Sequence, residues 1–277
     1  MTRAFRLTLL HPCLGRWAGD VKYIRSWQME PLAPAAIAGL TPSGVDVRFY
    51  DDRLEQIPFD EPTDLVAISI ETYTARRAYQ VATEFRRRGV KVVLGGFHAT
   101  LCPDEARLYA DAVIVGEAED LWPQVIDDAR HGTLQPEYRQ VQRPDLSLAR
   151  FDRSIFKGKR YVPVTLIEAG RGCHFRCEFC AVQSYFGATQ NRRPVDQILA
   201  EVESTRKRGN FYFFVDDNIT SNFDEAKDLY RELARLKIRW VSQASINAAH
   251  DEEFLELISR SGCQGLLIGF ESLERDT

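Results

Sequence analysis

Residues 168–180 read Glu-Ala-Gly-Arg-Gly-Cys-His-Phe-Arg-Cys-Glu-Phe-Cys and place Cys173, Cys177 and Cys180 on one short loop. The loop follows a β-branched run, Val162–Glu168, that predicts a strand. Three thiolates in so tight an arc can hold three corners of an iron–sulfur cubane and leave its fourth iron open. Because electron-transfer clusters usually have four cysteine ligands, a missing fourth thiolate points to an iron that binds a substrate or a cofactor.

Two other uses of these cysteines stay open. A structural zinc site could take His174 as its fourth ligand, but His174 is adjacent to Cys173, whereas zinc ligands are usually separated by two or more residues. A redox pair of Cys177 and Cys180 would leave Cys173 without a role, and the sequence around it lacks a thioredoxin-type context. The other cysteines are scattered along the chain, unlike a disulfide framework. We therefore favour the iron–sulfur cluster.

The second half of the chain, which this loop opens, alternates predicted strands with predicted helices. The strands are expected at Val162–Glu168, Phe211–Val215, Arg239–Ala244 and Gly265–Phe270, and the helices at about Val195–Arg208, Asp224–Leu236 and Asp251–Ser261. This alternation predicts a parallel (β/α) barrel. The sequence stops at Thr277, soon after the fourth strand, and a closed barrel needs more strands. We therefore expect a partial barrel, truncated after its fourth strand, in a fragment of a longer sequence.

The first half has a similar alternation and predicts an α/β domain of the doubly wound, Rossmann-like kind. Its strands are expected at Arg6–Leu10, Val45–Tyr50, Leu65–Ile70, Val90–Leu94 and Ala112–Val115. Gly132, Pro136 and Pro144 then break the pattern. The predicted organisation is a first domain at residues 1–130, a linker at 131–160 and the partial barrel at 161–277.

Composition argues against several classes of protein. A net charge of -4 and a pI near 5.8 argue against general electrostatic binding of nucleic acid, because nucleic-acid-binding domains usually carry an excess of basic residues. No stretch approaches the ~20 apolar residues of a membrane span. The N-terminus suits a first core strand better than a signal peptide. We therefore expect a cytoplasmic protein without a membrane span or a nucleic-acid partner.

Polar side chains lie at the ends of successive predicted strands of the second half. They are Asp216, Asp217 and Asn218 at the second strand, Gln243 and Ser245 at the third, and Glu271 and Ser272 at the fourth. Any one of them could simply cap the next turn. Their coincidence at the carboxyl ends of neighbouring strands, where α/β folds build sites, favours ligand contact.

Strand ends of the first domain carry a second candidate set. These residues are Ser69, Glu71, Thr72, Gly95, Gly96, His98, Gly116 and Glu117. The glycines leave room for a large flat ligand to approach the backbone at the carboxyl edge of the sheet. A dinucleotide would require G-x-G-x-x-G after the first strand, and that motif is absent. Nicotinamide or flavin binding is therefore not expected.

The spacing C-x3-C-x2-C resembles the motif of radical S-adenosylmethionine (SAM) enzymes, and Phe179 fills the aromatic position that commonly precedes its last cysteine. The resemblance implies that the three cysteines ligate a 4Fe–4S cluster whose free iron binds SAM. It implies that the reduced cluster cleaves SAM to an adenosyl radical. It also implies SAM contacts along the strand ends, although the usual Gly-Gly-Glu is replaced here by Asp216, Asp217 and Asn218. Glu271 and Ser272 stand in a similar G-x-E-S segment, and Gln243 and Ser245 point toward the same mouth.

The stretches GGFHATLCPDEA, from Gly95, and ADAVIVGEAEDLWP, from Ala110, resemble the N-terminal domain of cobalamin-binding radical SAM proteins. That group includes hopanoid methylases and the anaerobic magnesium-protoporphyrin cyclase of chlorophyll synthesis. The resemblance implies bound cobalamin. The D-x-H-x-x-G motif that supplies a histidine to cobalt is absent, so we expect water, no ligand or another side chain below the metal. His98 is expected to donate a hydrogen bond rather than to ligate cobalt.

The resemblance implies a reaction of one class, cobalamin-dependent methyl transfer to an unactivated carbon of a small-molecule substrate. It also implies an electron donor such as flavodoxin or ferredoxin. A radical rearrangement or cyclisation without net methylation is the alternative within the same family. A noncatalytic corrinoid- or metal-binding module is the alternative from a different class.

The cysteine loop generates the first prediction. Replacing Cys173, Cys177 or Cys180 by Ala should prevent stable assembly of an oxygen-labile 4Fe–4S cluster during anaerobic reconstitution, because each removes one of the three thiolates. Matched replacements of Cys13, Cys102 and Cys263 should leave assembly unchanged. Iron and sulfide content and the visible spectrum provide the measurement. Stoichiometric zinc without charge-transfer absorption would contradict the cluster.

Overall fold

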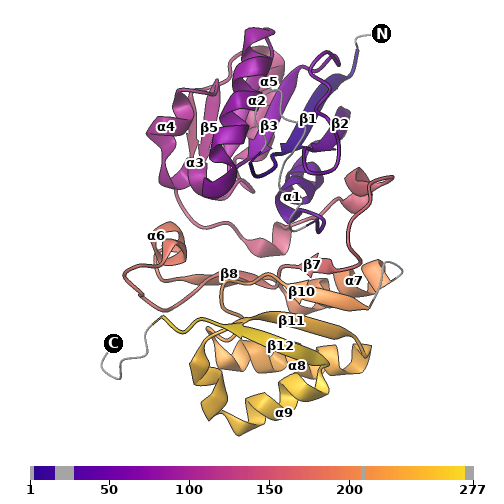
Figure 1. The fold of residues 1–277 in the computed structure, drawn as a ribbon, viewed down its shortest axis with the longest axis vertical. Helices are drawn as coiled ribbons and strands as arrows, with labels where there is room; N and C mark the ends of the chain where they lie inside the picture. Colours follow the sequence, from indigo (N-terminus) through magenta and orange to yellow (C-terminus); the bar gives the residue numbers. More distant parts are fainter. Residues whose placement is uncertain (1–2, 16–27, 207–209, 272–277) are drawn as a thin grey trace. The chain divides into compact units, whose positions relative to one another are not determined.

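Parallel sheets form the cores of the two units into which the chain divides, Met1–Tyr161 and Val162–Thr277 (Figure 1). The computed structural model describes residues 3–15, 28–206 and 210–271. In both units strands alternate with helices along the chain, which confirms the predicted α/β class.

The first unit contains a six-stranded sheet of order β2-β1-β3-β4-β5-β6, in which every pair is parallel. Its strands are β1 (Phe5–His11), β2 (Val45–Asp51), β3 (Leu65–Ser69), β4 (Lys91–Gly95), β5 (Ala112–Val115) and β6 (Glu137–Arg139). The chain changes direction across the sheet between β1 and β3, and open α/β sheets bind ligands outside the carboxyl ends of strands at such a switch point. The doubly wound fold is therefore confirmed, with its switch point at β1 and β3.

Helices cover both faces of this sheet. They are α1 (Leu32–Leu40), α2 (Ala75–Arg87), α3 (Phe97–Leu101), α4 (Pro103–Arg107) and α5 (Trp122–His131), with short 3-10 turns η1 (Thr72–Thr74), η2 (Leu146–Leu148) and η3 (Arg153–Phe156). α1 and α5 share one hydrophobic core with the sheet, and α2, α3 and α4 share the other. In α2 the apolar residues recur at helical spacing, so that Ala78, Ala82 and Phe85 are buried together. Burial of a side chain such as Phe85 contributes about 1.5–3 kcal/mol.

The segment 131–160, predicted as a linker, contributes to this unit. β6 pairs with β5 in register from Val113 opposite Glu137, and adds a sixth strand to the five that the sequence predicts. Tyr138 and Phe156 are buried in the core that contains α1 and α5. Three residues, Glu-Tyr-Arg, are too short a run to show the alternation by which strands are recognised in a sequence.

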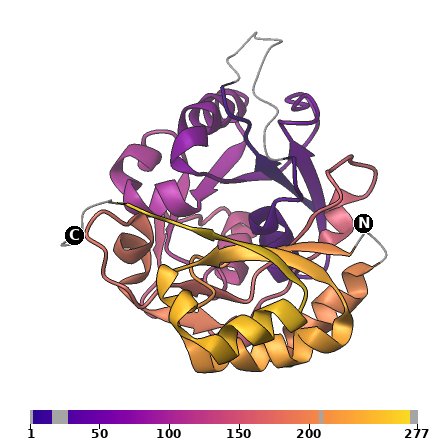
Figure 2. The same ribbon diagram turned by 60° about the horizontal axis from the view of Figure 1, so that its bottom comes forward.

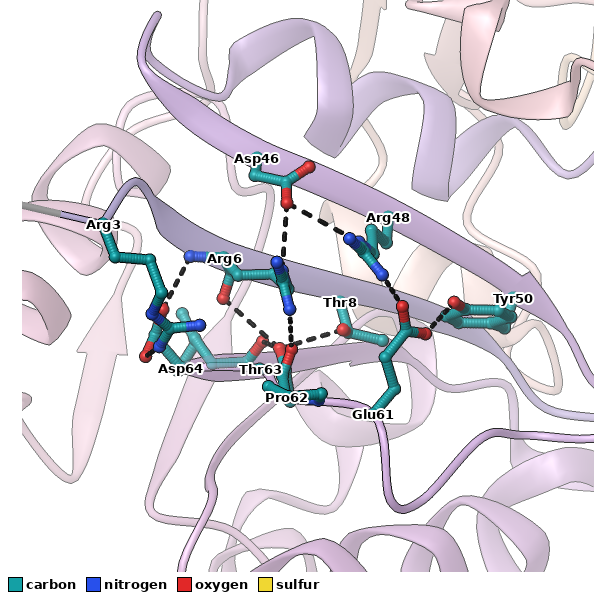
Figure 3. A network of polar contacts seen from close by, with 11 residues as sticks. Arg3, Arg6, Thr8, Asp46, Arg48, Tyr50, Glu61, Pro62, Thr63 and Asp64 are labelled. Carbon is teal, nitrogen blue, oxygen red and sulfur yellow. Dashed lines mark hydrogen bonds and ion pairs between the residues drawn. The ribbon is translucent and has the colours of Figure 1, made fainter.

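The connection from β2 to β3 has no α-helix, and a loop covers the sheet there instead (Figure 3). Arg6 of β1 donates from Nε to Asp46 Oδ2 at 3.0 Å, and its backbone N–H donates to Asp64 Oδ2 at 2.8 Å. Arg48 of β2 forms an ion pair with Glu61 of the loop. These contacts explain why Arg6 and Thr8 of β1, and Asp46 and Arg48 of β2, alternate with apolar residues. The apolar face packs on α1, and the polar side chains meet the loop.

The second unit contains a four-stranded parallel sheet of order β12-β11-β10-β7. Its strands are β7 (Thr165–Ile167), β10 (Phe211–Phe214), β11 (Arg239–Ala244) and β12 (Cys263–Ile268). Its helices are α7 (Val195–Thr205), α8 (Phe223–Leu236) and α9 (Glu252–Arg260), with the 3-10 turn η5 (Ile246–His250). The orange and yellow helices of Figure 2 lie along one face of this sheet, where Tyr230 and Trp240 stack at 5.0 Å between ring centroids. The four predicted strands and the parallel arrangement are confirmed.

A small hairpin in the second unit was not predicted. β8 (Gly170–Gly172) pairs antiparallel with β9 (Gln190–Arg192), and α6 (Ala181–Phe186) lies between them in the chain. Gly170 allows this pairing, because a Cβ atom there would lie 2.7 Å from the backbone oxygen of Asn191. The three cysteines lie between these two strands in the sequence. The pairing of β8 with β9 therefore closes the base of the cysteine loop.

The turn between α9 and β12 generates the second prediction. Gly262 has φ +93°, and a Cβ there would lie 1.9 Å from the backbone oxygen of Ile238. Gly262→Ala should therefore lower the free energy of unfolding by clearly more than the ~1–2 kcal/mol that a non-glycine residue costs in the left-handed conformation. Gly187→Ala is the matched control, because Gly187 has φ +66° and no atom within 4 Å of its Cβ position. The free energy of unfolding in urea measures both, and equal losses would contradict the clash.

Candidate functional site

The cysteine loop runs from the end of β8 to the start of α6. Cys180 precedes the first residue of α6, and its backbone N–H donates to the carbonyl oxygen of Cys177 at 3.1 Å. Cys177 is exposed, Cys173 and Cys180 are half-buried, and the ring of Phe179 is 71 % exposed. Across residues 3–15, 28–206 and 210–271, no three His, Cys, Asp or Glu side chains converge on one point that could hold a metal ion.

Residues at the end of β10 hold the base of this loop. Asp216 Oδ2 accepts from the backbone N–H of Ala169 at 3.0 Å, and Asp217 Oδ2 accepts from that of Gly172 at 2.7 Å. Ser221 continues the pattern, because its Oγ lies 2.8 Å from the backbone N and 2.9 Å from Nδ1 of His174. The residues predicted at this strand end thus meet the cysteine loop directly.

Residues at the ends of β10 and β11 also meet each other. Asn218 Nδ2 lies 3.4 Å from Cys173 Sγ and 3.2 Å from Ser245 Oγ. Gln243 Nε2 donates to the backbone oxygen of Asp216 at 3.5 Å. The structure therefore brings five of the predicted residues of the second unit to one edge of the sheet, next to Cys173. Glu271 is exposed near the end of the described chain, and the predicted Ser272 lies outside the described residues.

Asp216 is a carboxyl group buried to 1 % exposure. Burial raises its pKa to about 7, against the opposing effect of the Arg192 guanidinium and of the hydrogen bond from Ala169. Its Oδ1 atom has no hydrogen-bond partner in the described part of the chain. A neutral carboxyl at this position costs less to bury than a carboxylate, which explains how it stays beneath the loop.

Ser69, Gly95 and Gly96 lie at the carboxyl ends of β3 and β4, beside the switch point of the first sheet. Ser69 lies opposite Gly95 in the register of β3 and β4. Gly96 has φ +92°, and a Cβ there would lie 2.7 Å from Ser69 Oγ and 2.9 Å from the backbone N of Ile70. Only glycine therefore permits the turn after β4 to pack this closely on β3.

His98 is turned toward the protein rather than toward the sheet edge. It is 7 % exposed, and its Nδ1 lies 3.2 Å from Thr72 Oγ1. Its Nε2 lies 3.6 Å from Glu105 Oε1 and has no hydrogen-bond partner among the described residues. The neighbouring Glu71 begins η1, where its backbone N–H donates to Thr74 Oγ1 at 3.1 Å. His98 and Glu71 therefore each contact a neighbouring threonine through one polar atom.

Gly116 and Glu117 are covered by the chain that follows β6. The backbone N–H of Gly116 donates to Thr100 Oγ1 at 2.9 Å. Glu117 is 6 % exposed, and its carboxylate binds Arg143 Nε at 2.9 Å. Gln140 Oε1 accepts from the backbone N–H of Glu117 at 2.9 Å. The Glu117 side chain is therefore held in a buried ion pair.

Sequence reasoning missed a buried charged cluster at the carboxyl ends of β1 and β2. Asp51 and Asp52 have no exposed surface; Arg53 binds the first at 2.7 Å and Arg77 the second at 2.7 Å. Burial alone would raise the pKa of each carboxyl, but the hydrogen bonds to arginine hold both below the usual value. Burial lowers the pKa of the nearby His11 to about 4, so its ring is neutral. The signal in the sequence was Asp-Asp-Arg directly after a strand.

The fold and the cysteine loop define a two-unit α/β protein with a three-thiol site at the strand ends of its second sheet. Residues 28–126 match the B12 binding domain family, and residues 167–277 match the Radical SAM superfamily. The chain therefore contains a B12 binding domain followed by a domain of the Radical SAM superfamily. The Radical SAM domain is the domain for a 4Fe–4S cluster and SAM, and the B12 binding domain is the domain for cobalamin.

Two curated relatives and one solved structure illustrate the similarity. The chain is 32 % identical to the bacteriochlorophyllide d C-12(1)-methyltransferase of Chlorobaculum tepidum, over 89 % of this chain and 56 % of the relative. It is 26 % identical to the hopanoid C-2 methylase of Rhodopseudomonas palustris, over 88 % and 49 %. The methyltransferase TsrM from Kitasatospora setae, solved with cobalamin and a 4Fe–4S cluster, has the same fold with a TM-score of 0.71 at 17 % identity, over 98 % of this chain and 62 % of that one. The chain spans about half the length of the curated relatives it matches.

In the described ranges no helix is both long enough and apolar enough to cross a membrane.

Asp216 generates the third prediction. Its pKa is raised in the folded protein, so its contribution to stability is full below the unfolded value near 4 and is lost as the pH rises through about 7. Asp216→Asn removes this titrating group. As the pH rises through that window, the free energy of unfolding of the wild type minus that of the variant should therefore fall by about 1.4 kcal/mol per pH unit.

Urea unfolding at pH 5 and pH 8 measures this difference, and Asp224→Asn, at an exposed position of α8, is the matched control. A wild-type-to-variant difference that is the same at both pH values would show that Asp216 is not buried as a neutral carboxyl.

Proposed function

We propose that this chain binds a 4Fe–4S cluster through Cys173, Cys177 and Cys180, together with SAM and cobalamin, and that its reaction is methyl transfer to an unactivated carbon. The observation that carries the proposal is the cysteine loop held at the strand ends of one sheet, in a chain that also contains a B12 binding domain. Three thiolates on one loop fit a cluster with one open iron. Named methyltransferases among the relatives support the type of reaction.

In this proposal, SAM lies against the strand ends of the second sheet. Gln243 and Ser245 provide amide and hydroxyl groups beside the loop, and Asp217 provides a carboxylate. Glu271 is exposed beyond β12 and can meet the ribose of SAM. Phe179 carries an exposed apolar ring beside two of the ligands, where it can exclude water.

Cobalamin in this proposal lies at the switch-point edge of the first sheet, across β1 and β3. The candidate residues Ser69, Glu71, Thr72, Gly95, Gly96, Gly116 and Glu117 lie at or just after the carboxyl ends of β3, β4 and β5, on the edge of the sheet to which the proposal assigns the corrinoid. The fit holds for a corrinoid without a histidine below cobalt, because His98 is buried against Thr72 and Glu105. When bound, the cluster and the corrinoid supply the radical and methyl-transfer chemistry, and the protein positions them.

The partners in this proposal are a small-molecule substrate and a one-electron donor such as flavodoxin or ferredoxin, in the cytoplasm. A tetrapyrrole is the first substrate class to test, because a relative at 32 % identity is a bacteriochlorophyllide d methyltransferase. The net charge of -4 supports a small-molecule substrate over nucleic acid.

The fourth prediction tests this reaction. Anaerobically reconstituted protein with hydroxocobalamin, SAM and a chemical reductant, given bacteriochlorophyllide d, should yield S-adenosylhomocysteine together with a methylated tetrapyrrole. Mass spectrometry measures both products and 5′-deoxyadenosine. Cys263→Ala is the control for a cysteine outside the loop, and Cys177→Ala should abolish turnover.

Other outcomes identify the alternatives. 5′-Deoxyadenosine without a methylated product would favour a radical rearrangement or cyclisation. A reconstituted cluster that cleaves no SAM would favour a noncatalytic corrinoid- or metal-binding module.

A further inference from the structure

Asn218 contacts one of the three proposed cluster ligands. Its Nδ2 atom lies 3.4 Å from Cys173 Sγ, and Cys173 is half-buried while Cys177 is exposed. We propose that Asn218 is a positioning residue whose amide N–H donates a hydrogen bond to the Cys173 sulfur and thereby raises the reduction potential of the cluster. The inference rests on the proposed cluster at Cys173.

The orientation of the Asn218 amide is determined by its other partners. Asn218 Oδ1 lies 3.1 Å from the backbone N of Thr220 and 2.8 Å from Thr220 Oγ1. A backbone N–H can only donate, so the amide oxygen has to face Thr220. The NH2 group is then the side that faces Cys173 and Ser245. Reversing the amide would place two donors against each other at Thr220.

The surroundings make this amide rigid. Asn218 is 6 % exposed and Thr220 is fully buried. Ser245 Oγ lies 3.2 Å from Asn218 Nδ2, and it donates onward to Asn247 Oδ1. Each of the two amide hydrogens therefore has its own acceptor, one sulfur and one hydroxyl. A hydrogen bond shielded from water has a larger electrostatic effect than an exposed one.

A single donor on one sulfur has a defined electronic effect. Reduction adds negative charge to a cluster and its thiolates, and an N–H dipole that points at a ligating sulfur stabilises the reduced form more than the oxidised form. The hydrogen bonds that Asp216 and Asp217 accept from the backbone N–H groups of Ala169 and Gly172 act differently, because they fix the backbone and do not involve a sulfur. The end of β10 thus divides two tasks between neighbouring residues: Asp216 and Asp217 shape the loop, and Asn218 adjusts the charge on one ligand.

The fifth prediction concerns the midpoint potential of the cluster. Asn218→Ala should shift it to a more negative value, so that the ratio of reduced to oxidised cluster at the wild-type midpoint falls by on the order of tenfold, or about 59 mV for one electron. Asn218→Asp should shift it in the same direction, because it keeps an acceptor for Thr220 and replaces the donor by a carboxylate. Redox titration of reconstituted protein without SAM, followed by electron paramagnetic resonance, measures the potential.

Asn222→Ala is the matched control. Asn222 caps α8 through Oδ1, four residues along the same segment. Its replacement should leave the potential unchanged. Potentials equal to the wild type in both Asn218 variants would overturn the inference. If both variants lose iron while Asn222→Ala retains it, Asn218 acts in assembly and the assigned effect on the potential is also overturned. A wild-type chain that takes up no cluster would instead contradict the proposed function.

Discussion

A loop that presents three thiolates needs a shape that the thiolates themselves cannot provide, and here backbone hydrogen bonds provide it. The N–H groups of Ala169 and Gly172 donate to carboxyl oxygens at the end of β10, and the N–H of His174 lies against Ser221. Parallel strands place these groups at one edge of the sheet, because their carboxyl ends align. Without that alignment the cysteine loop would have no fixed base, and the candidate site of the second unit depends on it.

The sequence predicted most of what depends on periodicity and spacing. The spacing of Cys173, Cys177 and Cys180 identifies the cysteine loop from the sequence alone. β-Branched runs such as 65–70 identify strands without knowledge of the strands beside them. β6 and the hairpin of β8 with β9 could not be predicted in this way, because each strand is three residues long and exists through its partner. Which strand-end residue contacts which loop atom is equally a tertiary property. Asp216 and Asp217 are adjacent in sequence, yet one is fully enclosed and the other is only half-buried.

Several polar residues at the strand ends of the first unit are buried and contact other residues of the chain. Glu117 and His98 resemble ligand contacts in the sequence, but the first is paired with Arg143 and the second is enclosed beside Thr72. Asp51 and Asp52 show the same effect, because a buried carboxylate requires a cation and each is bound by an arginine. A sequence records that a carboxylate follows a strand, but it does not record which arginine folds back onto it.

The two sheets therefore use their carboxyl edges in different ways. In the first sheet, the strand-end carboxylates of Asp51, Asp52 and Glu117 are paired with arginines, and Gly96 lets the turn after β4 pack closely on β3. In the second sheet, the strand-end side chains are directed at the cysteine loop, and Asn218 reaches a sulfur atom. A small charged cluster requires that arrangement, because its properties depend on the few dipoles that surround it.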